Sequence, residues 1–309
     1  MHRVFLCVTI DCECDKGAGW RSQRPLRFQG ISDGIGRRLQ PLFAAHGAKP
    51  TYLLSPEVLR DDASVSLLAA LEGSADLGSH LHGEYAEPGA FEPDVTSVFQ
   101  REYSREVETA KLTYLTDLFS RAFGRRPRSF RAGRFGIGEH SLGILESLQY
   151  TVESSVTPHM DWSASGARGL SFVGAPGQPY HPDPKAPARP GTSPILEVPV
   201  TIRPHRLSRV PLLGSKLEPR WLRPTRGTGT RLVAVAREEI QEGHEAHPDR
   251  PVILNAMFHN VEVIPAGSPY AATEKEAKRI LDRLGALLAF ARREGIPVVG
   301  LGDIAAIVA

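Results

Sequence analysis

The first residues that could do chemistry end the apolar run Val4–Ile10, in the stretch Thr9-Ile10-Asp11-Cys12-Glu13. Side chains alternate along a strand, so Asp11 and Glu13 would point the same way. Two carboxylates on one face repel each other unless a cation or a proton lies between them. The pair is therefore either part of such a site or two solvated loop acids.

A second candidate motif carries two histidines, in the stretch Gly78-Ser79-His80-Leu81-His82-Gly83-Glu84. In extended backbone, His80 and His82 share a face. Neutral imidazole is the commonest metal ligand at neutral pH. Two histidines and one carboxylate leave positions on zinc open for water and substrate. The sequence therefore favours a metal site built from these two segments.

Two further residues follow short apolar runs. Arg131 ends the run Ser129–Arg131 and could hold a carboxylate by a bidentate pair or form a surface salt bridge. His259 ends the almost wholly apolar run that begins at Val252. A histidine at the end of a buried strand has either a structural partner or a catalytic role. Because a metal site is predicted nearby, we expect His259 to have a catalytic role. Asn260 and Glu262 are candidates to orient its ring.

The elements that must position these residues alternate between short apolar runs and helical patterns. The runs predict strands at Val4–Ile10, Pro50–Leu54, Asp76–His80, Ser129–Arg131, Tyr150–Ser155, Leu196–Ile202, Val252–His259 and Pro297–Leu301. Such alternation is typical of parallel βαβ units. The first strand is not followed by Gly-x-Gly-x-x-Gly, which argues against a dinucleotide fold. Polar residues gather at several strand ends, which favours a barrel with its active site at the carboxyl end.

Two long helices are predicted from three-and-four spacing of apolar residues. The segment Phe99–Ala122 is expected to bury Phe99, Tyr103, Val107, Ala110, Tyr114 and Leu118. The last helix begins with the capping box Thr273-x-x-Glu276. Its expected buried residues are Ala277, Ile280, Leu281, Leu284, Leu287, Leu288 and Ala291.

Composition limits the class of protein. The 309 residues are 41% hydrophobic and 23% charged, which argues against disorder and coiled coil. The net charge of +2 gives no support for nucleic-acid binding. Cys7, Cys12 and Cys14 form a poor disulfide framework and fit a reducing compartment. No transmembrane segment or signal peptide is evident, so we expect a cytoplasmic protein.

One segment has an unusual composition. Residues 176–224 contain twelve of the chain's 25 prolines, and Arg203–Arg231 has eight Lys or Arg residues against one acid, Glu218. Proline interrupts both helix and strand, so an insertion is predicted at about 163–231. It is either a solvated surface excursion, a surface for acidic membranes or a partner protein, or a lid that binds phosphate on a substrate. The candidate phosphate-binding residues are Arg203, Arg206, Arg209, Lys216, Arg220, Arg223 and Arg226.

The ordered set of motifs resembles the polysaccharide deacetylases, the NodB-homology carbohydrate esterases, over roughly residues 4–303. Besides the motifs around Asp11, His80, Arg131 and His259, the stretch Val156-Thr157-Pro158-His159-Met160-Asp161-Trp162 lies where the family has an Asp/Trp motif. The resemblance implies an α/β fold, a distorted (β/α) barrel of seven or eight strands. We therefore predict one such domain over residues 1–309, with the Pro/Arg-rich insertion.

The resemblance also implies roles for individual residues. Glu13, His80 and His82 would bind one divalent metal ion, with zinc expected; Asp11 would be the general base, Arg131 would orient it, and His259 would assist the tetrahedral intermediate or the leaving amine. Arg134, Asp161 and Trp162 would contact substrate. The family's usual His-x-x-x-His is replaced by His80-x-His82, with Glu84 at the last position, so the third ligand is His82 or Glu84, with His82 favoured.

These roles predict a metal-dependent N-deacetylase that releases acetate from an N-acetylated sugar or sugar-containing intermediate, with or without a phosphate link. Two other hypotheses remain open. One is a metal-dependent hydrolase of another non-peptide C–N bond, such as a formamide or a cyclic amide. The other is a non-catalytic carbohydrate-binding protein that keeps the barrel.

Overall fold

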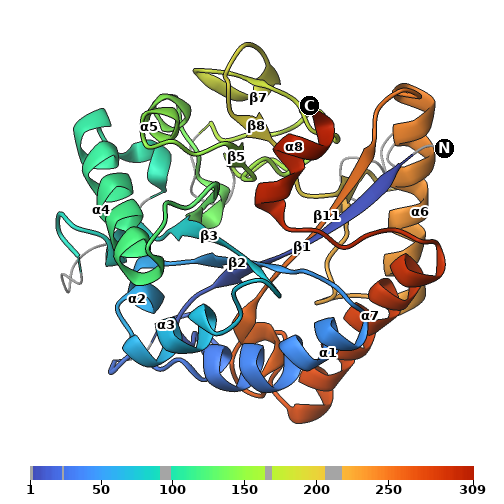
Figure 1. The fold of residues 1–309 in the computed structure, drawn as a ribbon, viewed down its shortest axis with the longest axis horizontal. Helices are drawn as coiled ribbons and strands as arrows, with labels where there is room; N and C mark the ends of the chain where they lie inside the picture. The colour runs from blue at the N-terminus through green and yellow to red at the C-terminus, as the bar shows by residue number, and fades with distance from the viewer. Residues whose placement is uncertain (1–2, 23, 91–98, 164–168, 206–217) are drawn as a thin grey trace.

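Seven parallel strands form one curled sheet in the order β11-β1-β2-β3-β4-β5-β8 (Figure 1). The computed structural model describes residues 3–22, 24–90, 99–163, 169–205 and 218–309. The strands are β1 Val4–Cys12, β2 Thr51–Leu54, β3 Asp76–Leu81, β4 Ser129–Ala132, β5 Val152–Glu153, β8 Leu196–Glu197 and β11 Val252–His259. All six pairings are parallel, as the strand–helix alternation predicted.

The two edges of the sheet come together through a few hydrogen bonds. The Thr201 amide donates to the Asn255 carbonyl at 3.0 Å, and the Asn255 amide donates to Thr201 Oγ1 at 2.8 Å. These bonds join the segment after β8 to the middle of β11. The sheet is therefore a distorted (β/α) barrel, and the predicted fold class is confirmed.

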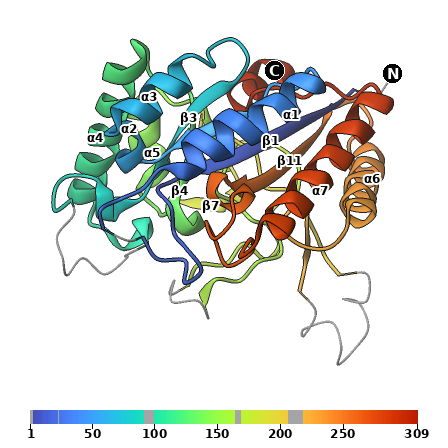
Figure 2. The same ribbon diagram turned by 90° about the horizontal axis from the view of Figure 1, so that it is seen from below.

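Helices cover the outer face of the sheet (Figures 1 and 2). The α-helices are α1 Gln40–Ala45, α2 Pro56–Leu59, α3 Asp62–Ala69, α4 Arg105–Phe123, α5 Ser141–Ser147, α6 Gly229–Ala246, α7 Glu274–Arg293 and α8 Ile304–Val308. A wider helical segment, Gly30–Leu39, leads into α1. Short 3-10 turns lie at Gly83–Tyr85, Gln100–Glu102, Gly133–Phe135, Asn260–Val263 and Leu301–Asp303. None of the helices described is both long and apolar enough to cross a membrane.

The expected last strand, Pro297–Leu301, does not form. Val298 makes a single bridge to Leu6, and the chain then leaves the sheet. The Leu301 amide donates to Thr51 Oγ1 at 2.7 Å and the Gly302 amide to Asp76 Oδ2 at 3.0 Å. Leu301 and Ile304 are buried with Cys7, Leu53 and Ile253. This segment therefore closes the amino end of the barrel, opposite the strand ends that carry the candidate site.

The prediction for α7 is largely confirmed, whereas the face predicted for α4 is wrong. Thr273 and Glu276 form the capping box, and all the predicted residues of α7 are buried except Leu281, which is half-buried. On α4 the buried residues are Glu108, Lys111, Leu112, Leu115, Thr116 and Phe119. Lys111 can be buried because it donates to the carbonyls of Gly83, Ala86 and Pro88. Leu112, Leu115 and Phe119 give this face an apolar three-and-four spacing, and the hydrogen bonds of Lys111 allow a charged residue to lie on it.

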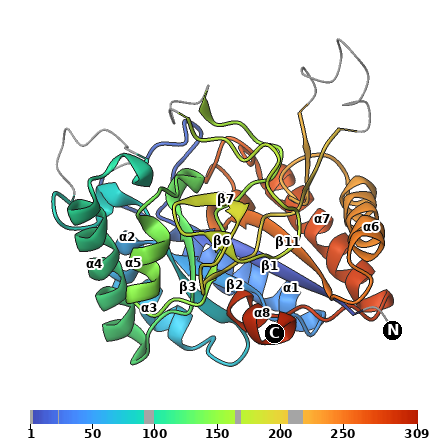
Figure 3. The same ribbon diagram turned by 90° about the horizontal axis from the view of Figure 1, so that it is seen from above.

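The Pro/Arg-rich region contains one barrel strand and two pairs of short antiparallel strands. The barrel strand is β8, and the antiparallel pairs join β6 Pro182–Asp183 with β7 Ala186–Pro190 and β9 Ile202–Arg203 with β10 Arg220–Trp221. In Figure 3 the chain that follows β1 lies on one side of the sheet, and the chain that leads into β9 and out of β10 lies on that same side. This side holds the carboxyl ends of the parallel strands.

Candidate metal centre and active site

Asp11 and Glu13 stand at the carboxyl end of the central strand β1, where both are only 2% exposed. Cross-strand pairing puts Asp11 beside His259 on β11. The Glu13 backbone is fixed by Asn260, whose side chain accepts from the Glu13 amide and donates to its carbonyl, each at 3.0 Å. Asn260 was predicted to orient His259, but it positions Glu13 instead.

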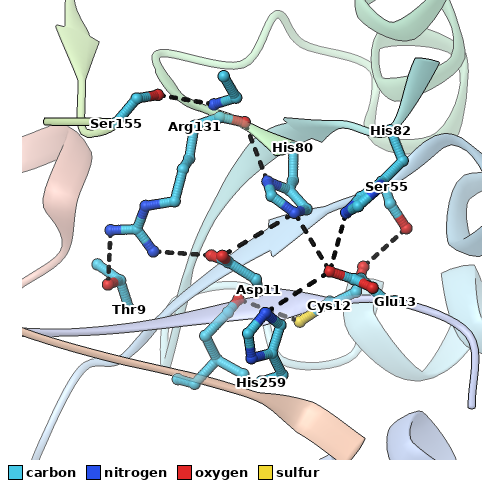
Figure 4. A network of polar contacts seen from close by, with 12 residues as sticks. Thr9, Asp11, Cys12, Glu13, Ser55, His80, His82, Arg131, Ser155 and His259 are labelled. Carbon is cyan, nitrogen blue, oxygen red and sulfur yellow. Dashed lines mark hydrogen bonds and ion pairs between the residues drawn. The ribbon is translucent and has the colours of Figure 1, made fainter. Parts of the chain in front are cut away.

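Three imidazole rings converge on one oxygen of Glu13 (Figure 4). The Nε2 atoms of His82, His80 and His259 lie 3.0, 3.4 and 3.7 Å from Glu13 Oε1. Ligand atoms from Glu13, His80 and His82 all lie within 4.8 Å of one another, and all three residues are buried. β1 and β3 thus bring together the three residues expected to bind metal.

The other ring nitrogen of each histidine has a fixed partner. His80 Nδ1 lies 3.0 Å from the Arg131 carbonyl, His82 Nδ1 3.3 Å from Glu84 Oε1, and His259 Nδ1 2.8 Å from Glu262 Oε1. Because a carbonyl only accepts, His80 donates from Nδ1, and in the neutral ring its Nε2 lone pair faces the site. That buried Nε2 has no hydrogen-bond partner among the described residues. The donor set therefore fits a divalent cation.

The electrostatics of the site also favour a bound positive charge. Burial alone would raise the pKa of Glu13, but the charges of His82 and Lys16 hold it well below its usual range. Burial opposes protonation of His82, yet Glu13 and Glu84 raise its pKa to about 9. A cluster with these carboxylates attracts either a proton or a metal ion.

Lys16 is a site residue that the sequence reasoning missed. Its ammonium lies 2.8 Å from Glu13 Oε2 and is 7% exposed. The contact lacks hydrogen-bond alignment, so it is an ion pair. Lys16 occupies one carboxylate oxygen while the histidines face the other. Lys16 follows Glu13 by three residues, and this spacing would predict the ion pair only if the end of β1 next to Glu13 were already known.

Arg131 is fully buried and holds Asp11. Arg131 Nη1 donates to Asp11 Oδ1 at 2.7 Å, and Nη2 donates to Thr9 Oγ1 and Ser154 Oγ, each at 2.9 Å. Burial would raise the pKa of Asp11, but the Arg131 charge, with those of His80 and His259, lowers it below the usual value. The structure therefore shows a buried carboxylate partner and not a surface salt bridge, but Arg131 holds Asp11 through one hydrogen bond and not through the expected bidentate pair.

His259 is 14% exposed at the edge of the site and rests on a second charged network. Its partner Glu262 is fully buried and also binds the guanidinium of Arg223 and the hydroxyl of Thr225. Burial would raise the pKa of Glu262, but Arg223 and His259 hold it below its usual value. Trp20 meets the His259 ring edge to face, with centroids 4.9 Å apart. Glu262 contacts Nδ1 of the ring, which is the position expected of a residue that orients His259.

Glu84 stands behind His82 rather than beside Glu13. One of its oxygens faces His82 Nδ1, and its carboxylate forms an ion pair with Arg134. Burial opposes ionisation of Glu84, but His82 and Arg134 hold its pKa far below the usual range. The geometry therefore groups His82 with Glu13 and His80 and gives Glu84 the position of a residue that orients a ligand.

The three residues expected to contact substrate are not equally placed. Trp162 is half-buried, stacks on Phe135 with centroids 5.7 Å apart, and donates from Nε1 to Thr157 Oγ1. Arg134 is engaged with Glu84. Asp161 is exposed and accepts from the amide and hydroxyl of Ser163. Asp161 thus stabilises its own loop, and no described contact links it to the histidine cluster.

Four described arginines of the basic segment are paired with carboxylates of the same chain. Arg203 contacts Glu239 and Glu242, Arg220 contacts Glu238, Arg223 contacts Glu262 and Arg226 contacts Glu218. Arg206, Arg209 and Lys216 lie outside the described residues. The pairs of Arg203 and Arg220 hold this segment to α6, and the pair of Arg223 holds it to Glu262, whereas Arg226 and Glu218 both belong to the segment.

No protein-family model and no curated protein sequence matches the chain. Solved structures do resemble it. A protein assigned as a glycoside hydrolase/deacetylase from Parabacteroides distasonis has a TM-score of 0.68 at 13% identity, covering 99% of this chain and 71% of that one. A protein assigned as a polysaccharide deacetylase from Mycobacterium smegmatis has a TM-score of 0.55 at 12% identity, covering 99% and 90%. An allantoinase has a TM-score of 0.58 at 13% identity, covering 99% and 90%. At these identities the likeness shows the fold, which is that of the polysaccharide deacetylases, as the motif order predicted.

Proposed function

We propose that this protein is a metal-dependent N-deacetylase, which hydrolyses the acetamide of an N-acetylated sugar or sugar-containing intermediate and releases acetate. The observation that carries the proposal is the convergence of His80, His82 and His259 on Glu13, beside the Asp11–Arg131 pair. The deacetylase likenesses support the carbohydrate substrate.

Glu13, His80 and His82 would hold the ion, and their nitrogen and carboxylate donors suit zinc. When bound, the ion would polarise the acetamide carbonyl and lower the pKa of the attacking water. Glu84 orients His82, and the Arg131 carbonyl orients His80. Lys16 restrains Glu13 through its second oxygen. These contacts hold the three donor residues in place before any ion arrives.

Asp11 is the general base in this proposal. Its lowered pKa keeps it ionised at neutral pH, and Arg131 occupies Oδ1, so Oδ2 remains to accept the proton of the water. His259 is the general acid, because Glu262 fixes Nδ1 and leaves Nε2 facing the site. The protonated ring would stabilise the tetrahedral intermediate and give a proton to the departing amine.

The proposal also includes a cytoplasmic location for the protein and, as a further prediction, a phosphate group on the substrate. Cys7, Cys12 and Cys14 are buried and unpaired, which supports a reducing, cytoplasmic location. A phosphate-linked substrate stays a prediction. To bind Arg203, Arg220 or Arg223, the phosphate of such a substrate would have to compete with the glutamate that already pairs with each arginine.

The test is acetate release from N-acetylated mono- and oligosaccharides by the metal-loaded protein. Acetate that appears in step with free amine supports the deacetylase. The allantoinase likeness favours a second candidate, hydrolysis of a cyclic amide, which would open an allantoin-like ring without acetate. Sugar binding without either product would indicate the non-catalytic alternative.

His259→Ala is expected to lower kcat by about 10²-fold, because it removes the proton donor for the amine. The change in KM should be smaller, since the group acts on charge that develops in the transition state. Steady-state kinetics give both values. His247→Ala is the matched control because His247 is exposed and follows α6. An unchanged kcat in folded His259→Ala protein would remove His259 from the mechanism.

A further inference from the structure

Two fully buried carboxyl groups take no part in the proposed mechanism, those of Glu153 on β5 and Glu197 on β8. The two residues are direct partners in the parallel register of these strands. Paired residues of neighbouring strands point to the same face of a sheet, so the two side chains are neighbours. Two buried carboxylates in this arrangement repel each other, and the arrangement is stable only where a proton or a cation neutralises one of them.

Each of these carboxyl groups has one hydrogen-bonded oxygen and one oxygen without a partner. Glu153 Oε1 accepts from the hydroxyl of Ser155, and Glu197 Oε1 accepts from the Val156 amide at 3.1 Å. The second oxygen of each group, Oε2, is buried and has no hydrogen-bond donor among the described residues. Leaving a buried oxygen unpaired lowers stability. A proton on one Oε2 would make that oxygen a donor to the other glutamate.

The charged and titratable side chains around the pair have other partners. The cation that acts on Glu197 is Arg131 on β4, but its Nη1 donates to Asp11 at 2.7 Å. Tyr180 joins Glu197 through two backbone hydrogen bonds, of 2.9 and 3.1 Å, and its hydroxyl donates to the Pro187 carbonyl. In the described part of the chain neither side chain donates to the two glutamates, so a proton is the positive charge that fits.

The pair adjoins the residues that hold Arg131. Ser154 follows Glu153, and its carbonyl and hydroxyl accept from Arg131 Nε and Nη2 at 2.7 and 2.9 Å. Ser155, which donates to Glu153, accepts at its hydroxyl from the Ala132 amide at 2.8 Å. A displacement of Glu153 would therefore disturb the hydrogen bonds that position Arg131.

We propose that Glu153 and Glu197 share one proton in the folded protein, and that this proton holds β5 to β8 beside Arg131 and is lost as the pH rises. Burial raises the pKa of Glu197 well above its usual value, and the charge of Glu153 raises it further. The folded chain therefore keeps a proton that the unfolded chain loses near the ordinary pKa of a glutamate. The stability that this proton contributes is complete below that ordinary pKa and falls as the pH rises towards the raised pKa. The inference goes beyond the deacetylase function and does not depend on it.

The first test is urea unfolding of the parent protein and of Glu197→Gln from about pH 5.5 to about pH 8.5. The glutamine amide can donate to Glu153 as a protonated acid would, but it cannot lose a proton. The unfolding equilibrium constant of the parent should therefore rise relative to that of the variant, by up to about tenfold per pH unit. Titration of the histidine cluster acts on both proteins and cancels in this ratio. A ratio that does not change with pH would overturn the proposal.

Infrared spectroscopy of the same proteins detects the proton itself. At neutral pH the parent should show the carbonyl band of a protonated carboxylic acid, and this band should weaken in Glu197→Gln. Glu153→Gln should weaken it equally, because its amide can donate to an ionised Glu197, and this variant serves if the first one does not fold. Glu146→Gln is the matched control, since it changes an exposed glutamate of α5 and should leave the band unchanged. Absence of the band in the parent, or an undiminished band in either folded variant, would overturn the proposal.

Discussion

Asp11→Asn is expected to lower kcat by about 10²–10⁴-fold while the bound metal per protein stays unchanged. Asn keeps the size of the side chain and can still accept a hydrogen bond from Arg131, but it cannot take a proton from water. Asp11 is not one of the grouped donor residues Glu13, His80 and His82, although its Oδ2 lies 3.9 Å from His80 Nε2. Steady-state acetate release and metal analysis of the same preparation give the two numbers.

The variant also weakens a buried ion pair, and removing one partner of such a pair typically costs about 3–5 kcal/mol of stability. Thermal melting must therefore show that the variant is folded at the assay temperature. Asp282→Asn is the matched control, because Asp282 lies exposed on α7 and pairs only with Lys278 among its described ion pairs. If Asp11→Asn lost the metal at unchanged fold, Asp11 would be a ligand and the assigned roles would be reversed.

Glu13→Gln and His82→Gln should each abolish stoichiometric metal binding and acetate release together. Each removes one of three protein donors, and Glu13 is also the only carboxylate in the group. Glutamine retains most of the side-chain volume, so the buried site is disturbed mainly in charge and donor type. The measurement is metal content after equilibration with one equivalent of zinc and gel filtration.

Glu84→Gln separates the two candidates for the third ligand. If Glu84 only orients His82, the variant should still bind zinc, with affinity or activity lowered about 10–100-fold. Complete loss of metal in Glu84→Gln, with metal retained in His82→Gln, would transfer the ligand role to Glu84. His247→Ala, which changes an exposed histidine, controls for nonspecific zinc binding.

The parts of this site that could be predicted from the sequence are those fixed by strand ends. Asp11, Glu13, His80 and His82 each lie at or just after a short apolar run, and parallel strands bring such ends to one edge. The strand pairings then place Arg131 beside His80 and His259 beside Asp11. The fold and the grouping of these site residues therefore follow from two things: the local apolar runs, and the rule that parallel strands place their carboxyl ends at one edge of the sheet.

The remaining contacts depend on packing between distant segments. The partners Asn260–Glu13 and Arg223–Glu262 are 247 and 39 residues apart, and neither pair has a local pattern. The buried face of α4 was missed because it combines apolar residues with Glu108 and with Lys111, which donates to three carbonyls of another segment. The last expected strand failed because Leu301 and Gly302 find better partners at the amino end of the barrel. In both cases the missing information is a set of hydrogen bonds to a distant segment.

The most direct test of the central claim is a zinc titration of metal-free protein, with acetate release from an N-acetylated trisaccharide measured at each step. The proposed site predicts that activity is absent at the start, rises linearly and reaches its plateau at one equivalent of zinc. His82→Gln should stay at baseline throughout. Full activity in the metal-free protein, or a titration that is the same in His82→Gln, would contradict a deacetylase centred on Glu13, His80 and His82.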